Sequence, residues 1–266
     1  MNKFLLCCDM DRTILPNGHE KESPDARTSF SKLADRSEIT LVYVTGRHKE
    51  LIEQAINEYH LPIPDFAVAD VGSTIYNITD NRWETNIKWH EAIAPDWQGK
   101  QRAELLELLH DHPELELQEH EKQGKFKLSY YTPENINLEA LLDEIRNRFK
   151  EKSILASFIW SIDDMTHQGL LDILPRSANK LHAIRFLMEQ LDFDESNTVF
   201  AGDSGNDMEV FVSTIKSVVV GNATDKVKQA ALLQARSASN DNRLFIATEN
   251  YASGITEGFK HYFPDF

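Results

Sequence analysis

The sequence predicts an α/β protein, in which a Rossmann-like parallel sheet forms the core and a smaller α+β domain is inserted. Short apolar runs of strand length recur near both ends of the chain, without the polar alternation of half-exposed strands. Amphipathic helical segments separate most of these runs. Strands that alternate with helices in this way imply a parallel sheet with helices on its faces.

The predicted core strands are runs of apolar residues bounded by polar or turn-forming residues. They are Phe4–Cys8, Ile39–Val44, Phe66–Ala69, Thr198–Ala201, Val218–Val220 and Leu244–Ala247. The helices predicted between them carry apolar residues at helical spacing on one face. They are Ser23–Arg36, Lys49–Tyr59, Asn179–Leu191, Asp207–Ser213, Thr224–Gln234 and Gly254–Phe263.

The middle of the chain has a different pattern, which predicts the inserted α+β domain. Its expected strands are Asn86–Trp89, Lys125–Tyr131, Ile154–Ile162 and Leu170–Leu174, the first two exposed, and its expected helices lie around Pro95–His110 and Leu138–Lys150. We therefore predict a core made of 1–81 and 172–266 and an insert over 82–171. Two short connections to the core would act as a hinge.

Composition and charge limit the classes of partner. The 266-residue chain has 43 Asp and Glu against 28 Lys and Arg, a formal net charge of −15. Such a surface repels nucleic acid and anionic lipid, which bind through basic patches, so we expect neither partner. A small anionic substrate would need a local cation. The apolar stretches are too short to span a bilayer, and the early acidic residues do not fit a signal peptide, so we expect a cytoplasmic protein.

Two carboxylates follow the first predicted strand. Asp9 and Asp11 stand two residues apart, so in extended geometry their side chains point to the same side. In open α/β sheets, ligands bind beyond the carboxyl ends of the strands. Two like charges there need a hard cation such as Mg²⁺ or a shared proton. A plain polar turn is the alternative interpretation.

Three further segments place polar groups at similar positions. Asp203 and Asp207 follow the strand Thr198–Ala201 within the sequence GDSGND, whose glycines permit a sharp turn. Thr45 and Gly46 precede a helix, where a hydroxyl and free N–H groups suit a phosphate, although ordinary helix capping explains them equally well. Lys180 opens a helix against the macrodipole, which favours phosphate binding over a structural role, although exposed lysines are common.

Together these segments resemble, in order and type, the four motifs of the haloacid dehalogenase superfamily. The insert between the second and third motifs is similar to the class-B cap of sugar phosphatases and phosphomannomutases. Leu171–Pro175, GDSGND and Ala247–Tyr262 resemble the corresponding segments of sucrose-phosphate phosphatases. Arg12 departs from that family, which commonly has a small polar residue at this position.

The resemblance implies a mechanism and residue roles. Asp9 would be the nucleophile that accepts the phosphoryl group, and Asp11 the general acid and base. Thr45, Gly46, Lys180 and Asn206 would hold phosphate. The metal site would be formed by Asp9, Asp11 through its backbone carbonyl, Asp203 and Asp207, with Mg²⁺ as cofactor.

The expected reaction is hydrolysis of a small phosphorylated sugar, with sucrose phosphate or a related glycosyl phosphate as the first choice. Candidate substrate contacts are Arg47, His48, Lys125, Lys127 and Tyr130, because two lysines at i and i+2 of a strand would share a face. A phosphosugar mutase and a phosphorylatable signalling module remain alternatives. The oligomeric state is not indicated by the sequence.

Overall fold

The chain forms two compact units in this computed structural model, which describes residues 3–163 and 166–266. The core unit comprises 3–69, 75–84 and 180–266, and the inserted unit comprises 70–74, 85–163 and 166–179. That the insert predicted over 82–171 acts as a separate domain for substrate selection stays a prediction. The inserted unit extends further toward the C-terminus than that prediction, since it ends at Asn179.

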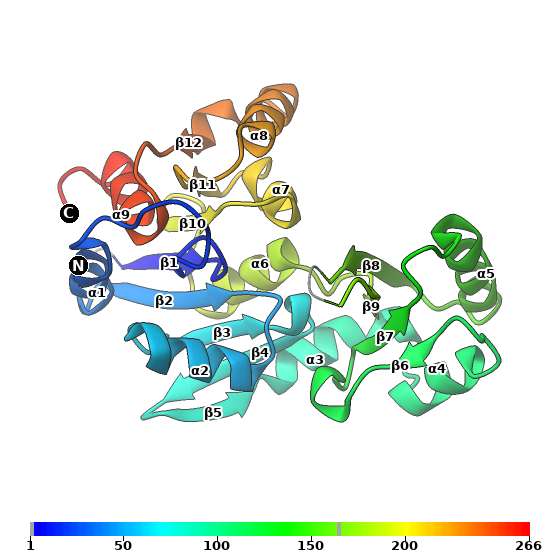
Figure 1. Cartoon of the computed structure of the whole chain (residues 1–266). Coiled ribbons are helices and arrows are strands. Elements are labelled where there is room, and N and C mark those ends of the chain that lie inside the picture. Colours follow the sequence, from blue (N-terminus) through cyan, green and yellow to red (C-terminus); the bar gives the residue numbers. More distant parts are fainter. Residues whose placement is uncertain (1–2, 164–165) are drawn as a thin grey trace. The chain divides into compact units, whose positions relative to one another are not determined.

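The core unit is built around an eight-stranded sheet with the order β12-β11-β10-β1-β2-β3-β4-β5 among the described residues (Figure 1). Its strands are β1 (Phe4–Cys8), β2 (Ile39–Val44), β3 (Phe66–Ala69), β4 (Thr74–Thr79), β5 (Arg82–Thr85), β10 (Thr198–Gly202), β11 (Lys216–Val219) and β12 (Leu244–Ile246). Its helices are α1 (Ala26–Ala34), α2 (Lys49–Tyr59), α6 (Lys180–Gln190), α7 (Met208–Phe211), α8 (Asp225–Ser237) and α9 (Tyr251–Tyr262). The α/β class with a parallel sheet is confirmed.

Strand β1 lies at the centre of the sheet and positions the polar residues that follow it. It pairs in parallel with β10 on one side and with β2 on the other. All five residues of β1 are buried, as expected for a strand covered on both faces. The residues after β1, β2 and β10 therefore meet at the same edge of the sheet.

The helices cover the sheet in two groups. Helices α1 and α9 contact each other, and Phe4, Leu6 and Cys8 of β1 belong to the core cluster that these helices complete. Helix α7 contacts both α6 and α8, and α6 also contacts β3. Because alternate residues of a strand face opposite sides, each face of β1 is supplied with apolar side chains.

Most predicted core elements are confirmed, with ends shifted by a few residues. The ranges of β1, β2, β3 and α2 coincide with the prediction, because abrupt polar boundaries mark their ends. Strand β4 and the edge strand β5, which end the sheet on the β3 side, were missed. They are joined by Asp80 and Asn81, which both have positive φ angles, as a type I′ hairpin turn requires.

The inserted unit has a four-stranded sheet with the order β6-β7-β9-β8, in which the paired strands run antiparallel. Its elements are α3 (Ile87–Ile93), α4 (Arg102–Leu109), β6 (Glu116–Leu117), β7 (Leu128–Thr132), α5 (Leu138–Glu151), β8 (Ala156–Ile162) and β9 (Gly169–Pro175). Short 3₁₀ turns in the chain are η1 (Asp70–Gly72), η2 (Ala94–Trp97), η3 (His120–Lys122), η4 (Gly205–Asp207) and η5 (Asp241–Arg243).

Three predictions for the insert are wrong. Asn86–Trp89 is not a strand but the start of α3, because the Asn86 side chain accepts a hydrogen bond from the Trp89 backbone N–H and caps the helix. The helix predicted over Pro95–His110 is interrupted at Gly99, which has a positive φ of 72°. The strand predicted over Lys125–Tyr131 begins only at Leu128 and is largely buried rather than exposed.

Within the described residues, we find no helix with the length and apolar character that crossing a bilayer demands.

Gly254 of α9 provides a test of how closely this helix approaches the sheet. A Cβ atom at this position would lie 2.4 Å from the Glu249 carbonyl oxygen and 3.2 Å from Val220 Cβ. Because a backbone oxygen cannot move aside at low cost, Gly254→Ala should lower the free energy of unfolding by about 1–3 kcal/mol. Urea denaturation measures the change. Lys260→Ala, at an exposed position of the same helix, should stay within about 0.5 kcal/mol, and equal stability of both variants would contradict the close contact.

Candidate active site

The candidate site lies in the core unit, in a cavity of about 360 Å³ at the carboxyl ends of the strands. The lining residues come from the loops after β1, β2 and β10, together with one residue of α2. They are Asp9, Asp11, Arg12, Thr45, Gly46, Arg47, Leu51, Asp203, Ser204 and Asn206. Segments far apart in the sequence are therefore brought to one place by the parallel sheet.

Asp9 is buried and held by two donors on one of its carboxylate oxygens. Oδ1 accepts a hydrogen bond from the Met10 backbone N–H at 2.8 Å and lies 3.0 Å from the Lys180 ammonium. Among the described residues, no hydrogen bond engages Oδ2. Burial raises the pKa of Asp9 to about 8, because it outweighs the attraction of Lys180, and the Asp207 charge adds to the rise. One oxygen is thus fixed and the other is available to a ligand.

Lys180 is the buried cation of the site. Its Nζ lies 3.0 Å from Asp9 and 2.7 Å from Asp207, and it also donates to the Asn206 side chain at 3.4 Å. Burial alone would lower the pKa of Lys180, but the two carboxylates raise it above its usual value. The ammonium therefore stays charged and holds two acids from separate motifs together.

Asp207 organises the loop after β10. Its Oδ2 accepts from the backbone N–H groups of Asp203 at 3.1 Å and Ser204 at 3.2 Å, while Oδ1 faces Lys180. A Cβ atom at position 202 would lie 2.4 Å from Asp207 Oδ2, so Gly202 is required for this approach. Both oxygens of Asp207 are thus engaged, which suits an orienting role more than direct contact with a ligand.

Asp9, Asp203 and Asp207 have the character of a cation site. Oxygen atoms from the three buried carboxylates all lie within 4.8 Å of one another. Oxygen donors in such a cluster suit a hard divalent ion such as Mg²⁺. Burial raises the pKa of Asp203, and the negative charge of Asp207 raises it further. The positive charge of Arg12 lowers this pKa and so offsets part of the rise, which leaves it at about 6. The residues present therefore fit the predicted metal, although Thr13 and Arg12 already engage the two oxygens of Asp203.

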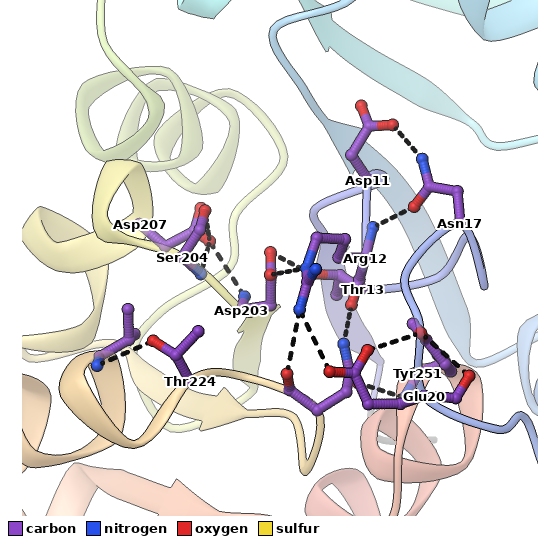
Figure 2. A network of polar contacts seen from close by, with 12 residues as sticks. Asp11, Arg12, Thr13, Asn17, Glu20, Asp203, Ser204, Asp207, Thr224 and Tyr251 are labelled. Atoms are coloured by element: carbon purple, nitrogen blue, oxygen red, sulfur yellow. Dashed lines mark hydrogen bonds and ion pairs between the residues drawn. The ribbon is translucent and has the colours of Figure 1, made fainter. Parts of the chain in front are cut away.

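Asp11 lies at the exposed side of the cavity and is paired with Arg47. The guanidinium donates from Nε to Oδ2 at 2.9 Å and from Nη2 to Oδ1 at 2.6 Å, and Asn17 donates to Oδ1 at 2.7 Å (Figure 2 shows the Asn17 contact). Burial raises the pKa of Asp11, but these bonds and the Arg47 charge outweigh it, so the pKa is lowered overall. The resting carboxyl is therefore ionised. Its side chain does not join the acidic cluster.

The predicted phosphate-binding loop after β2 has a suitable local geometry. Thr45 is fully buried, and its hydroxyl oxygen accepts from the Arg47 backbone N–H at 3.2 Å, which leaves the hydroxyl proton free for another acceptor. Gly46 is exposed in the cavity wall. His48, a predicted substrate contact, does not line the cavity. It precedes α2 and its Nδ1 lies 2.8 Å from Glu50.

The predicted substrate residues of the inserted unit separate into an exposed and a buried group. Lys125 is exposed, with its ammonium 5.4 Å from the Phe126 ring centroid. Lys127 is buried, and its Nζ lies 3.6 Å from Asp172. Since both precede β7, they do not share a strand face as expected. Tyr130 lies within β7 and is buried, which raises the pKa of its hydroxyl to about 12.

Sequence reasoning did not assign a role to several residues at the site. Asn222 follows β11 and accepts the Tyr251 backbone N–H, while its amide donates to the Arg12 carbonyl oxygen. Thr13 donates to Asp203 Oδ1 at 3.4 Å, and Arg12 reaches Oδ2 of the same carboxylate. Asn222 lies two residues after the predicted strand Val218–Val220, which was a usable signal because the carboxyl ends of parallel strands converge.

Comparison with known proteins places these features in a family. The family model of sucrose-6F-phosphate phosphohydrolase matches residues 2–263. A putative HAD-like hydrolase of Nitrosococcus oceani is 51% identical over 99% of this chain and 72% of its own length. Sucrose-phosphatase 2 of Nicotiana tabacum is 29% identical over 97% of this chain, which spans only 59% of that relative's length.

A solved structure shares both the fold and the extent of the chain. The sucrose-phosphatase from Synechocystis sp. PCC6803, in complex with sucrose and phosphate, matches with a TM-score of 0.74 and 26% identity. The match covers 98% of each chain.

The raised pKa values of Asp9 and Asp203 predict how cation binding depends on pH. At neutral pH the cation-free site holds a proton that a divalent ion must displace. The affinity for Mg²⁺ should therefore rise between pH 6 and pH 8, by up to about tenfold per pH unit for each proton released. Calorimetric titration in buffers of different ionisation enthalpy measures both the affinity and the proton release. An affinity that does not change with pH would contradict the protonated site.

Proposed function

Since the chain belongs to the sucrose-6F-phosphate phosphohydrolase family of phosphoric monoester hydrolases, we propose that it is a magnesium-dependent sugar-phosphate phosphatase that acts through an aspartyl-phosphate on Asp9. The observation that supports this most is the buried arrangement of Asp9, Lys180 and Asp203 at the carboxyl end of the parallel sheet. The sucrose-phosphatase relatives make sucrose phosphate or a related glycosyl phosphate the first substrate to test.

In the first proposed step, Asp9 forms a bond to phosphorus while the bond from phosphorus to the sugar oxygen breaks. The unengaged Oδ2 is the attacking atom, because Oδ1 is fixed by Met10 and Lys180. Asp11, once protonated, gives its proton to the leaving sugar oxygen. The phosphate oxygens would be held by Lys180, Asn206 and the Thr45–Gly46 loop, which together offer one charge and several donors.

In the second proposed step, Asp11 accepts a proton from water as the water oxygen bonds to phosphorus. The bond between Asp9 and phosphorus then breaks, which releases inorganic phosphate and restores the carboxylate. Mg²⁺, held by Asp9, Asp203 and the Asp11 carbonyl oxygen, would supply charge that offsets the phosphoryl oxygens. Asp207 keeps the loop in place through the N–H groups of Asp203 and Ser204.

The Arg47–Asp11 pair gives Arg47 a part in the first step. As long as the pair is intact, Asp11 stays ionised and cannot serve as an acid. A substrate phosphate or hydroxyl that draws Arg47 away removes the interaction that lowers the Asp11 pKa. Substrate binding would then be coupled to proton uptake by Asp11.

A panel of phosphate esters tests the proposed function directly. Hexose phosphates, sucrose phosphate and other disaccharide phosphates are incubated with the full chain, with and without Mg²⁺. Free phosphate and isomerised sugar phosphate are both measured. Magnesium-dependent phosphate release with no isomerised product supports the phosphatase. Isomerised product without release would favour a mutase, and a lasting phosphoprotein without turnover would favour a signalling module.

Replacement of the proposed nucleophile should stop turnover. Asp9→Asn keeps the size of the side chain but removes the charge that attacks phosphorus, so phosphate release should fall by at least about a thousandfold. Circular dichroism verifies the fold of the variant. Asp192→Asn, the same chemical change at an exposed position, should retain full activity. Asp9→Asn activity above a few per cent would rule out Asp9 as the nucleophile.

Lys127 offers a test of sugar selection by the inserted unit. We propose that its ammonium, fixed by Asp172, contacts the sugar rather than the phosphate. Lys127→Met should therefore lower kcat/KM for the best sugar phosphate by about 10–100-fold, the loss expected for one charged hydrogen bond. Turnover of a small aryl phosphate should change less than about threefold. Lys152→Met, the same change at an exposed position of the inserted unit that is not a candidate substrate contact, is the control. Equal losses on both substrates would place Lys127 outside sugar recognition.

A further inference from the structure

Arg12 directly follows Asp11, the second acid of the first motif, and its guanidinium contacts the loop after β10. Its Nε lies 3.3 Å from Asp203 Oδ2, and its Nη2 donates to the Asn222 carbonyl oxygen at 3.3 Å. The same Nη2 lies 3.5 Å from Glu20 Oε1. Figure 2 shows the guanidinium between Asp203 and Glu20. Arg12 thus has two carboxylate partners, of which only Asp203 belongs to the acidic cluster.

The backbone of Arg12 is fixed on both sides. Its N–H donates to Asn17 Oδ1 at 2.7 Å, and its carbonyl oxygen accepts from the Asn222 amide. The residue has a φ of 55°, a conformation that side chains other than those of Asn, Asp and Gly adopt infrequently. The loop after β1 therefore holds the Arg12 backbone at a fixed place, from which the side chain extends to Asp203 and Asn222.

The partners of Arg12 connect the site to the start of α9. The Tyr251 hydroxyl donates to Glu20 Oε2 at 3.1 Å, and the Tyr251 backbone N–H donates to Asn222 Oδ1 at 2.8 Å. Tyr251 belongs to the C-terminal segment that resembles sucrose-phosphate phosphatases but has no part in the proposed chemistry. That segment therefore helps to hold the partners of Arg12 in place.

Every carboxylate of the site has a cationic partner within the chain. The pairs are Asp9–Lys180, Asp207–Lys180, Asp11–Arg47 and Asp203–Arg12. Lys180 is buried between its partners, whereas the Arg12 side chain is 35% exposed and has Glu20 as a second partner. Arg12 is therefore the cation that can leave the cluster at the lowest cost.

We infer that Arg12 competes with the divalent cation for Asp203, so that the proposed metal site binds Mg²⁺ more weakly than its acidic residues alone would. This inference rests on the metal site of the proposed function. In the cation-free enzyme the guanidinium neutralises Asp203. When the cation binds, Arg12 keeps its contacts with Glu20 and the Asn222 carbonyl oxygen.

The repulsion between the cation and the guanidinium sets the size of the effect. A divalent ion bound to Asp203 would lie within a few ångströms of a fixed positive charge. Water screens part of this repulsion because Arg12 is partly exposed, yet loss of the charge should still tighten binding about tenfold. Asp203 remains oriented without Arg12, because Thr13 donates to its Oδ1 at 3.4 Å.

Calorimetric titration of Mg²⁺ alone into the full chain tests the inference, with a set of matched variants. Arg12→Asn removes the charge but suits the positive φ, so Kd should fall about tenfold. Arg12→Lys keeps the charge, so Kd should stay within about threefold of the wild-type value. Glu20→Gln removes the second partner and leaves Arg12 closer to Asp203, so Kd should rise about threefold.

The Kd values of these variants test the competition by Arg12 separately from the existence of the metal site. An unchanged or higher Kd for Arg12→Asn overturns the competition by Arg12. If circular dichroism shows that Arg12→Asn does not fold, Glu20→Gln decides, and an unchanged or lower Kd overturns it. If no Mg²⁺ binds to the wild-type chain or to Arg12→Asn, the metal site of the proposed function fails as well. Binding with equal Kd in both refutes only the inference about Arg12.

Discussion

The candidate site depends on one buried ammonium group. Lys180 lies between Asp9, which follows β1, and Asp207, which follows β10. Without this charge, two buried carboxylates would face each other in an apolar surrounding, at a cost of about 3–5 kcal/mol for breaking such a pair. The pairing is therefore a condition for folding the site as well as for its chemistry. It also explains why a lysine stands first in α6, where the helix dipole opposes it.

The GDSGND sequence follows from the same interaction. Asp207 faces Lys180 with one oxygen, and its other oxygen accepts the backbone N–H groups of Asp203 and Ser204. This geometry brings the Asp207 carboxylate against position 202, where only glycine fits. The loop that presents Asp203 is thus shaped by the residue that the buried lysine holds. A substitution at any of these positions would disturb charge balance and loop geometry together.

Local patterns predicted the elements whose boundaries are chemically abrupt. β1, β2, β3 and α2 were predicted residue by residue, because apolar runs end there at charged or turn-forming groups. The strand predicted at Asn86–Trp89 is the start of a helix. The Asn86 side chain caps that helix, and this interaction has more influence than the short pattern of alternating polar and apolar residues that indicated a strand. At the site, strand-end acids were predictable from the convergence of parallel strands. The contacts of Arg12 were not, because they join residues about 190 positions apart.

The contrast between the two arginines of the site has a mechanistic consequence. Arg47 pairs with Asp11 through two bonds and lowers its pKa, whereas Arg12 pairs with Asp203, whose pKa stays raised by burial. At neutral pH the resting site therefore keeps the proposed acid ionised. If Asp11 acts as proposed, the acid forms only when a ligand displaces Arg47. Proton delivery would then follow substrate binding, which restricts the first step to ligands that engage Arg47.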